Sequence, residues 1–357
     1  MTTPVTYVIM AGGQGERLWP LVRRGVPKVC VSNGSRSVLG ETLSRLRGLS
    51  PRQRVLIVTA ASQKQPVRAV LPRACHRWIV TEPQPRNTAA CIALAASIVA
   101  ARDPGGILVA LPADHWVSPI DGFRRTLRAA IEVARQDPRM VTIGLRPTRI
   151  HSGLGHLCTA GPADLRYGCR TRRLVRFIEK PSAARAAQLM KQQGTYWNAG
   201  VFVAQVATFL RLIARYLPNH ATRIGPLGRL VDRAVFARRA ARVYRNLPAV
   251  SFDDGVMAHV RDGHVVEAAY RWEDLGSWDS WVRTSRAHAP TVMVDSRRTH
   301  VVSAEGRNTH LVAVVGVDDV IVVHTPDATL VCRAAKAQLV RAVVAQLAQR
   351  KHLGRYR

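Results

Sequence analysis

The strongest constraint on the fold is a regular alternation of short apolar runs with segments of helical length. The apolar runs are rich in Val and Ile, and they cover residues 5–10, 54–59, 78–81, 107–111 and 140–144. Between them, apolar residues recur at helical spacing over 37–46, 88–102 and 122–135. This alternation is typical of a parallel sheet covered by helices on both faces, so we expect an α/β fold.

The pattern changes twice further along the chain. Residues 145–205 predict strands interrupted by Gly and Pro, and residues 206–260 predict helices. After Pro290, residues 301–332 predict short strands with turns at 305–308, 317–319 and 326–327, and a basic helix is expected over 336–350. We therefore predict a large α/β domain over residues 1–287 and a small β-rich domain with a terminal helix over 288–357.

The charge balance is unusual for a globular chain. Of the 357 residues, 53 are Lys or Arg and 23 are Asp or Glu, which gives a formal net charge of +30. The basic residues form no tract and no patch interleaved with aromatic residues, and only six of them are lysines. We interpret them as arginines on solvated surfaces, with nonspecific binding of polyanions as a side effect and no specific nucleic-acid partner.

The cysteines and the N-terminus give no sign of a secreted or membrane-bound chain. The six cysteines show neither CxxC spacing nor a Cys/His cluster, so neither a zinc site nor a disulfide framework is expected. The first residues lack the basic region and cleavage site of a signal peptide. The longest apolar stretch, 91–101, is far shorter than the roughly 20 residues that span a bilayer. We expect a cytoplasmic protein without membrane association.

The first apolar run leads into a glycine-rich segment. It reads Ala11-Gly12-Gly13-Gln14-Gly15-Glu16-Arg17-Leu18-Trp19-Pro20 and is followed by Pro27-Lys28. Three glycines within four residues let the backbone approach a ligand closely, so that successive N–H groups can face one anion. Arg17 and Lys28 can then neutralise phosphate charge. The spacing matches neither a P-loop nor a dinucleotide fingerprint, and a bare GGxG favours the simpler explanation, a glycine-rich turn with two surface cations.

Seven further motifs follow this segment in a fixed order. The eight are GGxGxRLWPLxRxxxPK from Gly12, EPQPRNTAA from Glu82, LPADH from Leu111, SGLGHL from Ser152, FIEKP from Phe177, YWNAGVF from Tyr196, SFD from Ser251 and WEDLGSW from Trp272. Taken together, they resemble the signatures of sugar-phosphate nucleotidyltransferases, in particular of mannose-1-phosphate guanylyltransferases. The resemblance covers residues 5–283, with a further match to the family's C-terminal β segment through Cys332.

The resemblance implies a Rossmann-like domain with a mixed, mainly parallel sheet, followed by a small segment similar to part of a β-helix. It implies Mg²⁺-assisted transfer of GMP from GTP to mannose 1-phosphate, which yields GDP-mannose and pyrophosphate. The attacking oxygen of a sugar 1-phosphate is already ionised at neutral pH. Catalysis in such enzymes therefore needs positioning and charge neutralisation rather than a general base.

The resemblance also assigns individual residues. The expected catalytic residues are Arg17, Lys28, Asp114, Lys180 and Asp274. Two carboxylates that converge on one point repel each other unless a cation lies between them, so Asp114 and Asp274 are the expected Mg²⁺ ligands. The neighbouring Glu273 should face the opposite way on an extended segment. The residues expected to contact the nucleotide are Ala11, Gly12, Gly13, Gly15, Arg17, Lys28, Glu82, Arg86, Asn87, Thr88 and Asp114. Those expected to contact the sugar phosphate are Gly155, Glu179, Lys180, Asn198 and Gly200.

Two expectations come from the residues themselves. Asn87 and Thr88 stand at an N-cap position, so the following helix should present free N–H groups beyond the strand ends. Trp197 and Trp278 are expected to pack in the interior rather than to stack on a ligand.

Several positions depart from the family pattern and leave alternatives open. Leu154, His156 and Leu157 replace the usual Tyr, Tyr and Ile, and Ala258 replaces an acidic residue. The alternatives are transfer to another hexose 1-phosphate or from another nucleotide, and a weakly catalytic regulatory homologue. No cupin-like isomerase half is expected. The sequence leaves the oligomeric state open, with a homodimer as one alternative.

Overall fold

The computed structural model describes the chain except residues 1–2, 14, 33–35, 50–53, 285–289 and 304–309. Within the described residues, nine strands form one sheet in the order β3-β2-β1-β4-β9-β6-β10-β8-β7. They are β1 (Val5–Met10), β2 (Arg54–Ala60), β3 (Ile79–Glu82), β4 (Ile107–Pro112), β6 (Met140–Leu145), β7 (His156–Arg166), β8 (Cys169–Ile178), β9 (Thr195–Gln205) and β10 (Gly263–Glu267). Strands β8 and β9 run opposite to the others, so the sheet is mixed and mainly parallel, as predicted.

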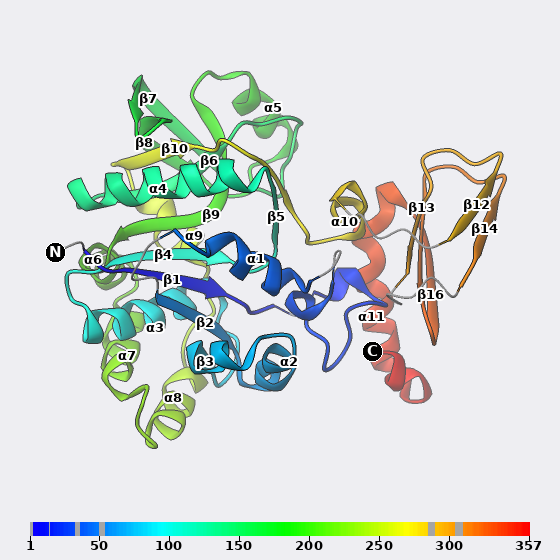
Figure 1. Cartoon of the computed structure of the whole chain (residues 1–357), viewed down its shortest axis with the longest axis horizontal. Coiled ribbons are helices and arrows are strands. Elements are labelled where there is room, and N and C mark those ends of the chain that lie inside the picture. The colour runs from blue at the N-terminus through cyan, green and yellow to red at the C-terminus, as the bar shows by residue number, and fades with distance from the viewer. Residues whose placement is uncertain (1–2, 14, 33–35, 50–53, 285–289, 304–309) are drawn as a thin grey trace.

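Helices cover both faces of this sheet (Figure 1). The α-helices of the large domain are α1 (Val38–Leu46), α2 (Lys64–Ala69), α3 (Asn87–Arg102), α4 (Ile120–Gln136), α5 (Ala183–Lys191), α6 (Val206–Tyr216), α7 (Pro218–Ile224), α8 (Phe236–Arg245), α9 (Phe252–Gly255) and α10 (Trp278–Thr284). Its 3₁₀ turns are η1 (Glu16–Leu18), η2 (Lys28–Cys30), η3 (Ala61–Gln63), η4 (Arg73–Trp78), η5 (Gly225–Leu230) and η6 (Met257–His259).

The alternation of side chains along β1 shows how the two faces are filled. Tyr7 and Ile9 are fully buried on the face that packs against α1 and α4. Val8, between them, is buried in the other cluster, together with α3 and α6. Since successive side chains of a strand point to opposite faces, one short apolar run contributes to both cores.

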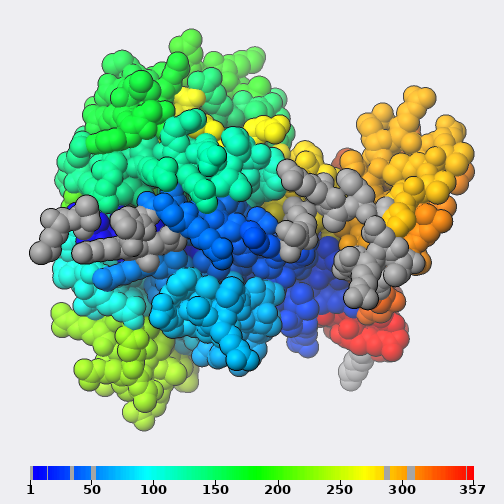
Figure 2. Space-filling view, in the orientation of Figure 1, coloured from blue at the N-terminus to red at the C-terminus, as the bar shows by residue number. Residues whose placement is uncertain are grey.

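A two-stranded antiparallel sheet lies beside the large one, made of β5 (His115–Ser118) and β11 (Arg271–Asp274). The chain then continues into the C-terminal domain. Its elements are β12 (Thr291–Val294), β13 (His300–Ser303), β14 (Val312–Val315), β15 (Val320–Thr325), β16 (Ala328–Arg333), η7 (Ala334–Leu339), α11 (Val340–Gln349) and η8 (Lys351–Tyr356). Figure 2 shows these C-terminal strands as a lobe at one end of the molecule.

Most of the elements predicted from the sequence are confirmed within two residues. The five expected strands and three expected helices are β1, β2, β3, β4 and β6, and α1, α3 and α4. The prediction of strands alone over 145–205 was wrong, because α5 interrupts them. The terminal helix begins as a 3₁₀ turn and is α-helical only from Val340. The turn at 305–308 and the domain boundary at 287/288 lie outside the described residues.

No helix in the described part of the chain is long and apolar enough to cross a membrane.

Candidate functional site

The site is built at the edge of the sheet where β4 ends. Asp114 follows β4 directly, and the pairing of β5 with β11 places His115 opposite Asp274. The backbone N–H of Leu275 donates to the carbonyl of Asp114 across 3.3 Å. A small antiparallel sheet thus brings together two acidic residues that are far apart in the sequence.

Lys28 lies between these two carboxylates. Its Nζ is 2.6 Å from Asp114 Oδ2 and 3.3 Å from Asp274 Oδ1, and its side chain is only 9% exposed. Burial by itself would lower the pKa of Lys28, but the two carboxylates hold the pKa above its ordinary value. Burial would likewise raise the pKa of Asp114, and the Lys28 ammonium keeps that pKa below its ordinary value. The group is therefore a charged triad that lies at the carboxyl ends of the strands.

Glu273 points away from this triad, as the sequence predicted. Its two carboxylate oxygens each lie 3.1 Å from an Nη atom of Arg149, and Arg283 Nε donates to it across 3.2 Å. The alternation of side chains along β11 therefore separates the two adjacent acids: Asp274 faces Lys28, and Glu273 faces two arginines.

Asp114 and Asp274 fit a divalent cation in part. Their oxygens face one point, which the Lys28 ammonium occupies here, and carboxylate oxygens are the ligands that Mg²⁺ prefers. Among the described residues, no three His, Cys, Asp or Glu side chains gather closely enough to hold a metal ion. A cation bound here would thus take its remaining ligands from phosphate and water.

The glycine segment leads from β1 to this triad. Ala11 is buried, and its N–H donates to the carbonyl of Val58, while Gly12 and Gly13 are exposed. Gly15 has a φ of 65° and immediately precedes η1. The backbone at Gly12 and Gly13 is thus exposed at the end of β1.

Arg17, in η1, lies at the edge of the triad. A Cβ atom placed on Gly276 would be 3.3 Å from Arg17 Nη2 and 3.1 Å from Asp274 Oδ2. The guanidinium and the carboxylate thus flank the same stretch of backbone. The structure therefore brings four of the five expected catalytic residues together: Arg17, Lys28, Asp114 and Asp274.

A second polar cluster contains most of the residues expected at the sugar phosphate. Lys180 Nζ is 2.5 Å from Glu179 Oε1, and this hydrogen bond holds the pKa of Lys180 above its usual value. A Cβ atom on Gly155 would lie 2.8 Å from Glu179 Oε2, and the Gly155 carbonyl accepts from the backbone N–H of Asn198 across 2.8 Å. Residues from three strands and their connections therefore converge here.

The side chain of Asn198 is held by the protein itself. Its Oδ1 accepts from Thr142 Oγ1 across 3.2 Å and from the backbone N–H of Gly200 across 3.1 Å, and its Nδ2 donates to Asp253 Oδ1 across 2.7 Å. One N–H of the amide remains for a ligand. The rigid amide is therefore better suited to orient its neighbours than to supply several bonds to a sugar.

The two clusters share one edge of the sheet. Strand β9 is antiparallel to β4, so the end of β9 that carries Asn198 lies near the end of β4 that precedes Asp114. A Cβ atom on Gly200 would lie 3.5 Å from Pro112 Cγ. The end of β9 with Asn198 and the end of β4 that leads to Asp114 therefore lie at the same edge of the sheet.

Of the residues expected on the base and ribose side, Arg86 binds other parts of the protein and Glu82 is buried. Arg86 donates to the carbonyls of Tyr244 and Arg245 at the end of α8, across 2.8 and 2.6 Å. Glu82 is 6% exposed, burial raises its pKa to about 7, and its Oε1 is buried without a hydrogen-bond partner in the structure. These contacts tie the EPQPRNTAA segment to α8.

The start of α3 differs from the expectation. The Thr88 N–H donates to Asn87 Oδ1 across 2.8 Å, and the Ala89 N–H donates to the carbonyl of Val250 across 3.2 Å. The Thr88 hydroxyl accepts from the N–H of Phe252 across 2.8 Å. The prediction of free N–H groups was therefore wrong for Thr88 and Ala89, because a neighbouring side chain and the segment before α9 satisfy them.

Comparison with known proteins identifies the family. The model of the family described as "Nucleotidyl transferase" matches residues 6–290, and that of the "MannoseP isomerase/GMP-like beta-helix domain" matches residues 290–347. The chain belongs to the nucleotidyl transferase family.

Individual relatives agree with this assignment. A mannose-1-phosphate guanylyltransferase of Sinorhizobium fredii is 31% identical over 99% of this chain and 70% of its own length. An Escherichia coli protein of the same name is 29% identical over 97% of this chain and 76% of its own length. The crystal structure of a Thermus thermophilus protein, named a mannose-1-phosphate geranyltransferase, has a TM-score of 0.82 and 31% identity, and the match covers 97% of this chain and all of that one.

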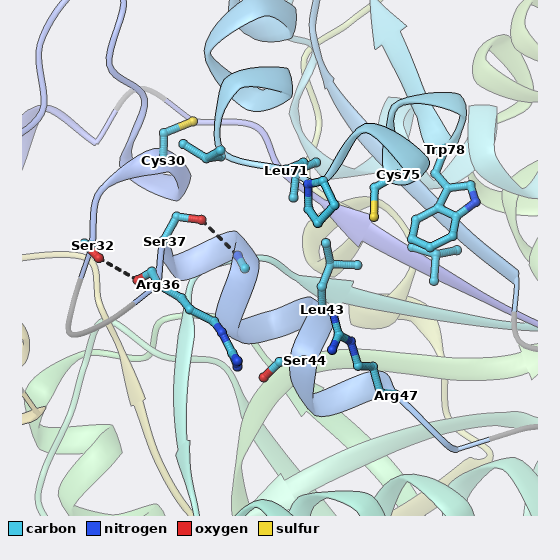
Figure 3. A pocket seen from close by; sticks show the side chains of 14 residues that line it. Cys30, Ser32, Arg36, Ser37, Leu43, Ser44, Arg47, Leu71, Cys75 and Trp78 are labelled. Carbon is cyan, nitrogen blue, oxygen red and sulfur yellow. Dashed lines mark hydrogen bonds between the residues drawn. The ribbon is translucent and has the colours of Figure 1, made fainter.

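This nucleotidyl transferase also has a cavity of about 540 Å³ beside α1 (Figure 3). Its walls carry apolar side chains such as Leu43 and Trp78, the thiols of Cys30 and Cys75, and two arginines. None of the described residues that line it belongs to the Asp114–Lys28–Asp274 triad, so the cavity is separate from that triad.

Two residues that bind expected site residues of the nucleotidyl transferase were not singled out from the sequence. Asp253 lies in the SFD motif, which the sequence had shown without a role for its acid. Gln338 gives no recognisable signal, because it belongs to no motif, yet its Oε1 accepts a hydrogen bond from Arg17. Trp278 is fully buried and Trp197 is 4% exposed, which confirms that both pack in the interior.

Proposed function

We propose that this nucleotidyl transferase moves GMP from GTP to mannose 1-phosphate and releases pyrophosphate. The observation that carries the proposal is the position of Lys28 between Asp114 and Asp274, at the sheet edge that also holds Glu179 and Lys180. One cluster suits a triphosphate and the other a sugar phosphate. The names of the Sinorhizobium fredii and Escherichia coli relatives support guanine as the base and mannose as the sugar.

The proposed reaction needs no general base from the protein. An oxygen of mannose 1-phosphate, already ionised, bonds to the α-phosphorus of GTP. The bond from that phosphorus to the oxygen bridging the β-phosphate breaks, and pyrophosphate leaves with the electron pair. The chain's task is to hold two polyanions in line and to neutralise their charge.

The charged residues divide this task between them. Arg17 and Lys28 would neutralise the triphosphate together with the exposed amides of the glycine segment. Lys180 would neutralise the sugar phosphate, and Glu179 would accept hydrogen bonds from sugar hydroxyls. Asn198 fixes the position of this cluster through its bonds to Asp253 and Thr142.

Mg²⁺ is the proposed cofactor, with Asp114 and Asp274 as its protein ligands. Bound there with phosphate oxygens, the ion would supply positive charge to the reacting phosphates. Lys28 keeps the two carboxylates close together when their charges would otherwise repel.

The test is pyrophosphate release from each pairing of GTP, UTP, dTTP and CTP with mannose 1-phosphate and glucose 1-phosphate, with and without Mg²⁺. We expect GTP with mannose 1-phosphate to have the highest kcat/KM and turnover to require the metal. A tenfold preference for another nucleotide would overturn the guanylyl assignment, and a preference for glucose 1-phosphate would overturn only the sugar.

A further inference from the structure

The C-terminal domain forms hydrogen bonds with the segment that carries Arg17. Arg17 Nη1 donates to Oε1 of Gln338 in η7 across 3.0 Å. Two residues later, the indole N–H of Trp19 donates to the carbonyl of Tyr356 in η8 across 2.7 Å. Figure 1 shows α11 and the C-terminus beside the segment that follows β1. The signature segment is thus held by residues more than 300 positions away.

The backbones that carry Arg17 and Gln338 are anchored in one apolar cluster. Leu18, next to Arg17, is 1% exposed, and Ala337, next to Gln338, is also 1% exposed. Both belong to the cluster that contains Trp278, which is completely buried. Packed interiors leave the backbone little freedom to shift. The hydrogen bond therefore joins two side chains whose backbones are held in place.

The two ends of the Arg17 guanidinium have different neighbours. Nη1 donates to Gln338, while Nη2 faces Gly276, where a Cβ atom would lie 3.3 Å from it. The amide of Gln338 is neutral, so it orients the guanidinium without cancelling the positive charge that a phosphate would use.

We infer that Gln338 is a positioning residue of the nucleotide site, which it serves by holding Arg17 in the orientation that binds the triphosphate. The inference rests on the proposed function, in which Arg17 contacts phosphate. An exposed arginine has many rotamers, and binding that must select one of them loses affinity. Gln338 makes that selection before the nucleotide binds. The C-terminal domain therefore contributes to the nucleotide side of the site.

The experiment compares steady-state kinetics of the full-length enzyme and two variants. Gln338→Met keeps the length of the side chain and removes the acceptor. We expect the KM for GTP to rise about three- to tenfold and kcat to stay within about twofold, because a hydrogen bond to a charged group is lost while the reacting groups stay in place.

Arg341→Ala is the matched control. Arg341 also joins the C-terminal helix to η1, through a pair with Glu16 at 3.5 Å that is largely exposed. Exposed ion pairs of this kind contribute little to stability, so the KM of Arg341→Ala for GTP should stay within about twofold of the wild-type value. An equal rise in both variants would overturn the inference, because the cause would then be a loosened domain contact.

A double-mutant cycle with Arg17→Ala decides whether Gln338 acts through Arg17. In the Arg17→Ala background, Gln338→Met should leave the KM for the nucleotide unchanged within about twofold. An unchanged KM in the single variant, or the same rise with and without Arg17, would overturn the inference. If the wild-type enzyme prefers another nucleotide, the proposed function fails, and the same cycle with that nucleotide still tests Gln338.

Discussion

Asn198 and Asp253 form a hydrogen bond of 2.7 Å that joins β9 to the short helix α9. Burial raises the pKa of Asp253 to about 7, and the charge of Glu179 adds to this effect. Lys180 opposes it, and Asp254 contributes a small further rise. A carboxyl group with such a pKa changes its charge near neutral pH, so the second cluster gains negative charge as the pH rises.

The raised pKa of Asp253 predicts a specific dependence of stability on pH. In the unfolded chain, an aspartate ionises at about pH 3.9. Its contribution to the free energy of unfolding is therefore fully present below that pH and is lost as the pH rises through about 7. Asp253→Asn retains an acceptor for Asn198 and does not ionise. We expect its Tm, measured relative to the wild-type Tm, to increase from pH 5 to about pH 7 and to level off towards pH 8.

Thermal unfolding followed by circular dichroism at intervals of one pH unit measures this difference. Glu82, whose pKa is also raised to about 7, adds the same background to both proteins and cancels. A difference in Tm that stays constant from pH 5 to pH 8 would contradict the buried ionisation of Asp253.

The position of Asp114 and Asp274 beside Lys28 predicts that replacing either carboxylate causes a large loss of turnover. Asp114→Asn and Asp274→Asn each remove a charged oxygen beside Lys28, at the position where we propose the metal. We expect kcat to fall by about 10² to 10³, as for the loss of other preorganised electrostatic contacts, with a smaller change in the KM for GTP. Pyrophosphate release at saturating Mg²⁺ measures this, and circular dichroism checks that the variants are folded.

Glu273→Gln is the control for these two variants. Its side chain binds Arg149 and Arg283 rather than Lys28, so kcat should stay within a few-fold of the wild-type value. Folded Asp114→Asn and Asp274→Asn variants with near-normal turnover would falsify the paired-carboxylate site. If Glu273→Gln alone abolished turnover, the metal ligand in the WEDLGSW segment would have been chosen wrongly.

The sequence predicted the large domain well because its strands carry strong local signals. Val5–Met10 and Ile107–Pro112 are continuous apolar runs that are buried on both faces. Strand β5, in contrast, has four residues and pairs with β11 more than 150 positions later. No periodicity reveals such a pairing, so the resemblance alone suggested that Asp114 and Asp274 would meet.

The missed features depend on contacts between distant segments. The guanidinium of Arg86 binds two carbonyls at the end of α8, a contact that no local pattern in the sequence indicated. Gln338 lies in no motif, and its contact with Arg17 depends on how η7 and α11 pack in the cluster that contains Leu18. Tertiary packing of this kind leaves no trace in local composition.

The close surroundings of Gly276 predict that an alanine at this position lowers kcat/KM for GTP. A methyl group there would lie 3.1 Å from Asp274 Oδ2 and 3.3 Å from Arg17 Nη2, closer than these groups comfortably allow. We expect Gly276→Ala to displace the guanidinium or the carboxylate and to reduce kcat/KM for GTP about tenfold, which corresponds to about 1.4 kcal/mol. The KM for mannose 1-phosphate should change by less than about twofold. Initial rates with one substrate varied at saturation of the other measure the two constants.

The surroundings of Gly155 predict the opposite effect: an alanine at this position should impair binding of mannose 1-phosphate and spare GTP. A methyl group on it would lie 2.8 Å from Glu179 Oε2 and 2.7 Å from Cζ of Phe177. Phe177 is 4% exposed and packed in the core, so the Glu179 carboxylate is the group with more freedom to shift. Overpacking of this kind costs about 1 to 3 kcal/mol of stability, so the Tm should fall as well.

Because Glu179 is the partner of Lys180, its displacement in Gly155→Ala should raise the KM for mannose 1-phosphate about five- to tenfold, roughly 1 to 1.4 kcal/mol, and leave the KM for GTP within about twofold. The pair of variants tests the assignment of the two clusters directly, since each alanine should affect the substrate that the other spares. If Gly155→Ala raised the KM for GTP and Gly276→Ala that for the sugar phosphate, the two clusters would have been assigned to the wrong substrates. Equal losses for both substrates in both variants would show that the clusters do not bind them separately.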